Sequence, residues 1–250
     1  MKFMRCLCLL SILAVVMLPA AIGAQDQPKP LEPKFSLASG SEVIAADIFD
    51  TIVYLPFRIN GQGPYSFILD TGNGGPPILN EKLARALGIP LGEKLTAGGA
   101  GSKPVDLYLI DKMDAALPGL EFKAAPAATL PLDLMDPHWG KRKDGLIGGT
   151  MLSTVVTDID YARKTVRFLA PGTFSPPAGE AIPIEVFGQP FVKAKVFLHG
   201  AAQPVEALMM VDTGVRITTF NMPFSKQHRL PAQSPKSLAT MTGCGINGES

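Results

Sequence analysis

The chain has 250 residues, 46% hydrophobic and 18% charged, which is enough apolar material to bury a core in one or two domains. Lysine and arginine number 23 against 22 aspartate and glutamate residues, giving a net charge of +1. This balance gives no electrostatic reason to expect nucleic acid or an anionic membrane surface as a partner. We therefore expect a globular protein that binds no nucleic acid.

The first residues of the chain have the pattern of an export signal. Lys2 and Arg5 precede an apolar run, and small residues at positions 19–24 offer a cleavage region. The alternative is a membrane anchor, but the apolar run is only marginally long enough and is broken by Pro19. We therefore expect a signal peptide over residues 1–24, no stable membrane span, and a protein exported from a bacterial-type cell, periplasmic or secreted.

The remaining sequence is typical of a mainly β protein. Residues 25–34 lack hydrophobic periodicity and predict a flexible leader. Short β-type runs follow, such as residues 51–57 and 66–69, separated by glycine-containing turns. One two-turn helix is predicted over residues 81–87, because Asn80 can cap its start and a Gly-Ile-Pro sequence ends it.

One pattern occurs twice along the chain. A hydrophobic run, residues 65–69, leads into Asp-Thr-Gly at positions 70–72, and a second run, residues 207–211, leads into Asp-Thr-Gly at positions 212–214. Each copy is followed by an asparagine, a proline and a glycine-rich stretch at nearly the same spacing. A single Asp-Thr-Gly would be an ordinary turn, whereas two copies in register indicate a duplicated functional unit.

Asp70 and Asp212 are the candidate catalytic residues. A hydrophobic strand that ends in Asp-Thr-Gly holds an acid at the tip of a buried element, and the hydroxyls of Thr71 and Thr213 can connect the two loops. Two carboxylates at close range share a proton. The ionised partner can then activate a water molecule while the protonated partner polarises a peptide carbonyl, so that the amide is hydrolysed without a metal or a cofactor.

A metal site is not expected from the histidines. His138, His199 and His228 share no ligand spacing.

Through the two Asp-Thr-Gly copies and the Asp-Gly-Leu-Ile-Gly segment at 144–148, the chain from about residue 35 onward resembles aspartic proteases of the pepsin and retropepsin type. The resemblance implies a bilobed fold in which Leu146, Ile147 and Gly148 pack under the first catalytic loop. It also implies that Asp70 and Asp212 form the catalytic dyad. By the same resemblance, four residues support that dyad: Thr71, Gly72, Thr213 and Gly214. Four others form a mobile flap over the substrate: Gly98, Gly99, Ala100 and Gly101.

The same resemblance divides the chain into two lobes. A predicted hairpin, residues 157–161 and 165–169, is followed by a proline- and glycine-rich cluster, which predicts a linker over residues 171–182. The first lobe is then expected over residues 35–170 and the start of the second over residues 183–250. At the first lobe's spacing, the second hydrophobic-glycine element falls beyond position 250, so the second lobe is expected to be incomplete. The complete protein is then a two-lobed monomer, or the chain forms a homodimer.

Two departures from the family pattern leave the activity open. The residues that follow the two triplets are Asn73 and Val215, where the family usually has Ser, Thr or Ala. Asn73 could donate a hydrogen bond to its carboxylate, Val215 could not, and Arg216 would favour an ionised aspartate if it turned inward. We expect an aspartic endopeptidase that acts on peptide or protein substrates. The alternatives are a non-catalytic peptide- or envelope-binding protein that keeps the fold, or one whose paired loops are only a structural brace.

Overall fold

The first Asp-Thr-Gly loop lies at the end of a long hairpin in the computed structural model, which describes residues 31–97, 104–136, 140–198, 201–230, 244–245 and 248–249. Strands β4 (Ile52–Ile59) and β5 (Gln62–Leu69) are antiparallel. Asn60 and Gly61 join them with positive φ angles of 48° and 77°, which Asn and Gly adopt at low cost in tight hairpin turns. The two β-type runs predicted in this region are confirmed and are longer than expected.

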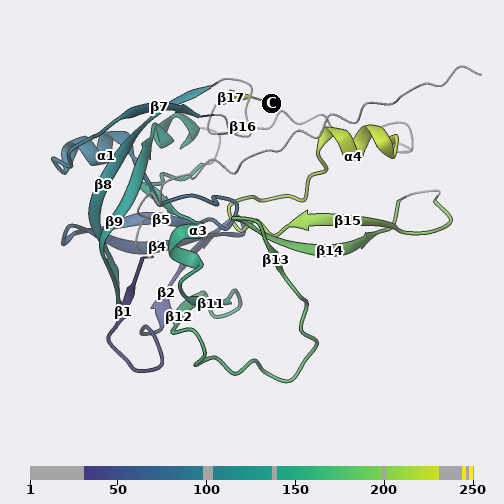
Figure 1. The fold of residues 1–250 in the computed structure, drawn as a ribbon, viewed down its shortest axis with the longest axis horizontal. Helices are drawn as coiled ribbons and strands as arrows, with labels where there is room; N and C mark the ends of the chain where they lie inside the picture. Colours follow the sequence, from purple (N-terminus) through teal and green to yellow (C-terminus); the bar gives the residue numbers. More distant parts are fainter. Residues whose placement is uncertain are drawn as a thin grey trace, which may run out of the picture. The chain divides into compact units, whose positions relative to one another are not determined.

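This hairpin is part of a nine-stranded sheet in the order β1-β9-β6-β10-β5-β4-β8-β7, with β3 paired to β4. Figure 1 shows β4 and β5 beside β8 and β9. Strand β10 is parallel to β5 and antiparallel to β6. The other strands of this sheet are β1 (Pro33–Phe35), β3 (Asp47–Phe49), β6 (Ile78–Asn80), β7 (Lys94–Ala97), β8 (Val105–Leu117), β9 (Leu120–Leu130) and β10 (Gly145–Ile147). The mainly β prediction is confirmed.

The core lies on both faces of this sheet because β4 is apolar on both sides. Val53, Leu55 and Phe57 belong to one buried cluster, whereas Ile52 and Tyr54 belong to the other. Successive side chains of a strand point to opposite faces, so a strand that is buried on both faces needs this continuous apolar run. The strand that carries Asp70 is likewise buried over its last three residues, and it provides a fixed base for the loop.

Short helices connect the strands. Helix α1 (Glu81–Ala86) begins after Asn80, whose side chain accepts a hydrogen bond of 2.9 Å from Lys82 N, so the predicted helix and its cap are confirmed. Its counterpart after the second triplet is α4 (Met222–Gln227), where Asn221 accepts from Phe224 N at 3.0 Å. The other helices of the described residues are α3 (Gly149–Leu152) and the 3-10 helix η1 (Leu132–Met135).

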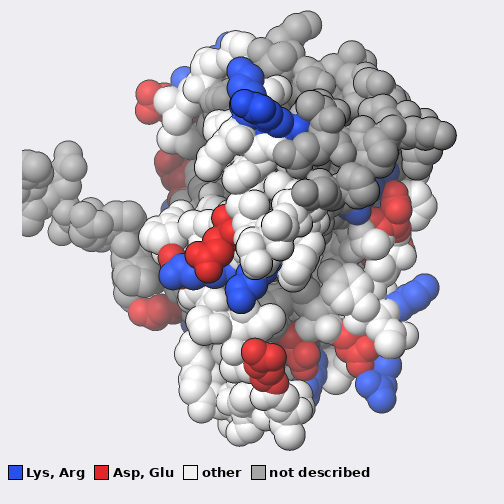
Figure 2. Space-filling model, turned by 90° about the vertical axis from the view of Figure 1, so that its right-hand side faces the viewer, with Lys and Arg blue, Asp and Glu red and all other residues white. Residues whose placement is uncertain are grey.

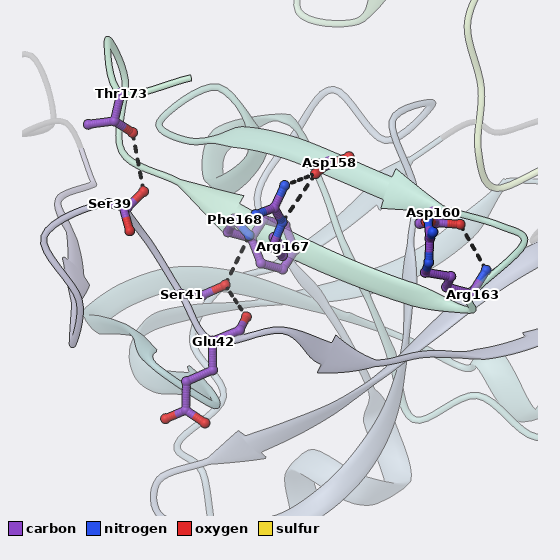
Figure 3. Close-up of polar contacts among 9 residues, drawn as sticks. All are labelled: Ser39, Ser41, Glu42, Asp158, Asp160, Arg163, Arg167, Phe168 and Thr173. Atoms are coloured by element: carbon purple, nitrogen blue, oxygen red, sulfur yellow. Dashed lines mark hydrogen bonds and ion pairs between the residues drawn. The ribbon is translucent and has the colours of Figure 1, made fainter. Parts of the chain in front are cut away.

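A smaller sheet holds the end of the first half. It has the order β11-β12-β2 and contains β2 (Ile44–Ala45), β11 (Val156–Asp160) and β12 (Thr165–Leu169), so the predicted hairpin is confirmed. Figure 3 shows the polar contacts that hold it. Arg167 lies opposite Asp158 and binds it at 2.6 Å, and Ser41 Oγ accepts a hydrogen bond of 3.0 Å from Phe168 N.

The segment predicted as a leader needs one correction. Its last residues are part of the fold, because Pro33 and Lys34 pair with Phe122 and Glu121 of β9, and Leu31 packs against the core. The apolar side chains at Leu31 and Phe35 supply the burial that the preceding polar residues lack. The predicted signal peptide and residues 25–30 lie outside the described residues, as do His138 and His199.

The second half forms a separate sheet. Strands β13 (Glu185–Val186), β14 (Pro190–Val196) and β15 (Val205–Met210) follow one another in antiparallel order. Residues 171–182, the predicted linker, contain no strand or helix, and all residues of 171–184 are exposed. Further along, β16 (Cys244–Gly245) pairs with β17 (Gly248–Glu249).

Candidate active site

The first aspartate is held by backbone groups of its own loop. Asp70 follows β5 directly, and its backbone N–H donates to Ile147 O at 3.1 Å. Its Oδ1 atom accepts hydrogen bonds from Gly72 N at 2.9 Å and from Asn73 N at 3.1 Å. Both donors belong to the same short loop, so the carboxylate is fixed with one oxygen turned toward the backbone.

The segment at 146–148 lies beside this loop. Leu146 and Ile147 of β10 stand opposite Ile68 and Leu69 of β5, and both β10 residues are buried. After them, Gly148 must lack a side chain, because a Cβ atom there would lie 2.3 Å from Nδ2 of Asn73. The structure therefore places these three predicted residues against the strand and the loop that carry Asp70.

The second aspartate has a similar setting. Asp212 follows β15, and its Oδ1 atom accepts a hydrogen bond of 2.7 Å from Gly214 N. The preceding residue, Val211, donates its backbone N–H to Pro190 O at 2.8 Å. Each aspartate thus lies one or two residues beyond the end of a β-strand and accepts a hydrogen bond from the glycine two positions after it.

The two loops are joined by a reciprocal set of hydrogen bonds between Thr71 and Thr213. Thr71 N donates to Thr213 Oγ1 at 3.1 Å, and Thr213 N donates to Thr71 Oγ1 at 3.0 Å. Each hydroxyl also donates across to the other half, Thr71 to Val211 O at 2.6 Å and Thr213 to Leu69 O at 2.7 Å. Both hydroxyls therefore act as donor and acceptor at once.

This arrangement brings each carboxylate against the opposite glycine. A Cβ atom added to Gly72 would lie 2.3 Å from Asp212 Oδ2, and one added to Gly214 would lie 2.5 Å from Asp70 Oδ1. Only glycine leaves room for such an approach of carboxylate to backbone. The sequence repeat is thus matched by a repeat in space, with the two aspartates facing each other.

The proximity of the aspartates changes the proton affinity of one of them. Burial, and next the charge of Asp212, raise the pKa of Asp70 to about 7, although the N–H groups of Asn73 and Gly72 act in the opposite direction. Two carboxylates that share a site cannot both ionise without a large electrostatic cost. At pH values below about 7, Asp70 therefore holds a proton beside its partner.

Residues 55–151 match the family model described as aspartyl protease. The sequence of this segment is thus similar to that of aspartyl proteases. A retropepsin-like aspartic protease from Rickettsia conorii is similar to the chain at 20% sequence identity, over 56% of this chain and 95% of that chain, with a TM-score of 0.36. No curated protein matches the chain. The aspartyl protease segment contains the first Asp-Thr-Gly loop and ends within α3.

Two possibilities that the sequence left open for the neighbours of the aspartates are resolved by the structure. The Asn73 side chain binds groups other than Asp70: its Nδ2 donates to Pro76 O at 2.9 Å and its Oδ1 accepts from Gly75 N at 3.1 Å. Arg216 turns toward the first lobe, where its Nε lies 3.2 Å from Asp50 Oδ2 and its guanidinium carbon lies 5.9 Å from the ring centre of Phe49. Asn73 instead shapes the loop, and Arg216 adds a contact between the halves.

A hollow of about 770 Å³ opens beside the second aspartate. Asp212 and Arg216 lie in its wall together with aromatic side chains, among them Phe191, Phe220 and Phe224. Polar and apolar groups share the lining about equally, because Gln189, Thr218 and Asn221 also belong to it.

The flap predicted at Gly98, Gly99, Ala100 and Gly101 lies outside the described residues. The strands on either side of it are described: β7 and β8 are antiparallel, with Ala97 opposite Val105. Among the described residues no group of three or more His, Cys, Asp or Glu side chains could hold a metal ion. In the same part of the chain, no helix is long and apolar enough to cross a membrane.

Sequence reasoning missed two residues with contacts at or next to the two Asp-Thr-Gly loops. Gln189, in the turn between β13 and β14, donates its side-chain amide to Gly72 O. Asp50, in the turn between β3 and β4, pairs with Arg216. A Gly-Gln-Pro sequence signals a turn at 188–190, but no local signal indicates which carbonyl its glutamine reaches.

The paired threonines give a prediction about stability. We expect Thr71→Val and Thr213→Val each to lower the free energy of unfolding by about 1–3 kcal/mol, because each leaves an N–H and a C=O of the opposite loop without partners. Thr71→Ser and Thr213→Ser keep the hydroxyl and serve as matched controls. Urea unfolding measures the difference, and equal stability of the Val and Ser variants would contradict a role for the hydroxyls.

Proposed function

We propose that the protein is an aspartic endopeptidase in which Asp70 and Asp212 share the acid and base roles. The observation that carries the proposal is that each carboxylate lies against the glycine of the opposite loop, so both face one small space. A water molecule bound between them would lose a proton to the ionised carboxylate as it attacks the peptide carbon. The protonated carboxyl would donate a hydrogen bond to the carbonyl oxygen and stabilise the charge that develops there.

The substrate we propose is an extended segment of a peptide or protein. The hollow beside Asp212 supports this choice, because its aromatic side chains can contact apolar side chains of a peptide and its polar groups can bind the peptide backbone. Both aspartates come from one chain, which supports a monomeric enzyme over a homodimer in which each copy supplies one aspartate. Acidic and basic side chains lie interspersed on the face in Figure 2, which gives no support for a nucleic-acid substrate.

Cleavage of an unfolded polypeptide tests the function. We expect products between about pH 3 and 7, detected by mass spectrometry, and a fall in rate as Asp70 loses its proton near pH 7. A peptide analogue with a central hydroxyl group should inhibit the reaction by occupying the position of the attacking water. Binding of that analogue without any product over long incubation would instead support the non-catalytic alternative.

The proton on Asp70 also predicts how stability depends on pH. Because the pKa of Asp70 is raised from 3.8 to about 7, the folded protein binds this proton more tightly than the unfolded chain does. Its contribution is therefore fully present below about pH 4 and is lost as the pH rises to 7, by a total on the order of a few kcal/mol. Thermal unfolding from pH 4 to 7 should show a falling Tm that is flatter in Asp70→Asn. Equal slopes of Tm against pH in the wild type and in Asp70→Asn would show that Asp70 is not the group with the raised pKa.

Export is the second part of the proposal. The basic residues, apolar run and small residues at the start of the chain support a cleaved signal peptide and a periplasmic or secreted enzyme. N-terminal sequencing of the protein recovered from a periplasmic fraction tests it. A protein that keeps Met1 and stays in the cytoplasm would contradict it.

A further inference from the structure

One side chain of the second half contacts the backbone of the first Asp-Thr-Gly loop. Gln189 lies in the turn between β13 and β14, and its Nε2 atom donates a hydrogen bond to Gly72 O. The turn is closed by a bond of 3.0 Å from Phe187 N to Gln189 O. It also packs on the first half, because a Cβ atom at Gly149 would lie 2.8 Å from Gly188 O.

The peptide group that Gln189 contacts also donates a hydrogen bond to Asp70. The carbonyl of Gly72 and the N–H of Asn73 belong to a single planar peptide unit, so fixing one end fixes the direction of the other. At the other end of this unit, Asn73 N donates to Asp70 Oδ1 at 3.1 Å. A hydrogen bond to the carbonyl also polarises the N–H and strengthens its donation.

The same turn is tied to the second aspartate. Pro190 follows Gln189 directly, and its carbonyl accepts the 2.8 Å hydrogen bond from Val211 N, next to Asp212. Phe191 then pairs with Met210 in the sheet that ends at Asp212. Two adjacent residues of one turn therefore hold the backbone beside both aspartates.

We propose that Gln189 is a positioning residue for the Asp70 and Asp212 site, acting through the peptide unit between Gly72 and Asn73. The inference rests on the proposed function for its kinetic consequences, although the hydrogen-bond chain itself does not. Gln189 donates to Gly72 O, Asn73 N donates to Asp70 Oδ1, and the carboxylate is held in the direction that faces Asp212. Without the glutamine the carbonyl end of this peptide unit loses its hydrogen bond, and the N–H at the other end donates less well.

Kinetics of Gln189→Leu and Gln189→Glu test this role. Leucine removes the donor, so kcat should fall by roughly two- to tenfold, the range expected for one hydrogen bond. Because the Asn73 N–H lowers the pKa of Asp70, its weaker donation should also move the upper limb of the pH profile to higher pH. Glutamic acid can donate only when protonated, so its kcat should approach that of the wild type below about pH 4 and fall further behind as pH rises.

Gln227 provides a matched control, since it is exposed on α4 and undergoes the same chemical changes in Gln227→Leu and Gln227→Glu. These variants should keep the wild-type profile. A role that is merely structural would lower the activity of Gln189→Leu and Gln189→Glu equally at every pH. That result, or unchanged kinetics in both variants, would overturn the proposal.

Titration of the Asp70 carboxyl carbon by NMR separates this inference from the proposed function. Its midpoint should lie roughly half a unit higher in Gln189→Leu than in the wild type, whether or not the protein cleaves peptides. Asp70→Asn assigns the signal. A wild-type protein that cleaves nothing, with the shift present, would refute the endopeptidase and leave the positioning role intact. An unchanged midpoint in a protein that does cleave would refute the positioning role alone.

Discussion

Asp70→Asn and Asp212→Asn should each reduce kcat for peptide cleavage by about 100- to 10,000-fold, the contribution of positioned acid–base groups. An amide has nearly the shape of a carboxyl group, so the loops and the threonine hydrogen bonds should persist. An amide cannot, however, accept or donate the proton that the carboxyl group transfers in the reaction, so the variant loses the role of that aspartate as base or acid. Initial rates on a chromogenic peptide measure the loss, and circular dichroism checks the fold.

The matched control for this pair is Asp111→Asn, which makes the same change on an exposed position of β8. It should keep the wild-type rate. If both dyad variants kept it as well, the assignment of the active site would be wrong. If only one did, the remaining aspartate would act alone, and the shared proton would play no part in catalysis.

Gly72→Ala and Gly214→Ala should lower the rate by about 100-fold, since a displacement of about 1 Å in a catalytic group is sufficient for such a loss. The added methyl groups would come within 2.3 Å of Asp212 Oδ2 and 2.5 Å of Asp70 Oδ1, closer than any real contact, so each forces the opposite carboxylate away. Each variant thus acts on the aspartate of the other loop.

Gly75→Ala is the control in the same loop. There the nearest atom to an added Cβ is Asn73 Oδ1 at 3.4 Å, an ordinary contact, so we expect near wild-type kcat. Comparison of kcat among the three alanine variants decides the matter. Equal losses in all three would indicate that the loops tolerate no side chain at any of these glycines, and that displacement of the opposite carboxylate is not the cause of the lower rate.

Local features of the sequence were sufficient to predict the parts that each half builds on its own. A continuous apolar run predicted β5, and the Asn80 cap predicted α1, because both signals lie within a few residues of their effects. The repeat added the pairing of the halves, since two strands with the same ending are expected to place their ends alike. This is why Asp70 and Asp212 could be named from the sequence.

The contacts that tune the site could not be predicted in the same way. Asn73 has two local partners, Gly75 and Pro76, and which of these or Asp70 it chooses depends on the detailed path of the loop. Arg216 and Gln189 reach residues more than a hundred positions away, and nothing in their neighbours indicates those partners. Such choices depend on tertiary packing, which outweighs local preference.

The crossed hydrogen bonds between the two threonines imply an order of events during synthesis of the chain. A ribosome releases the Asp70 loop long before Thr213 exists, so the first loop waits with the N–H of Thr71 and the carbonyl of Leu69 open to water. Only when the later half arrives do both loops find their donors and acceptors. A newly made chain therefore does not bring its two aspartates together until the second Asp-Thr-Gly loop has been made and has docked on the first.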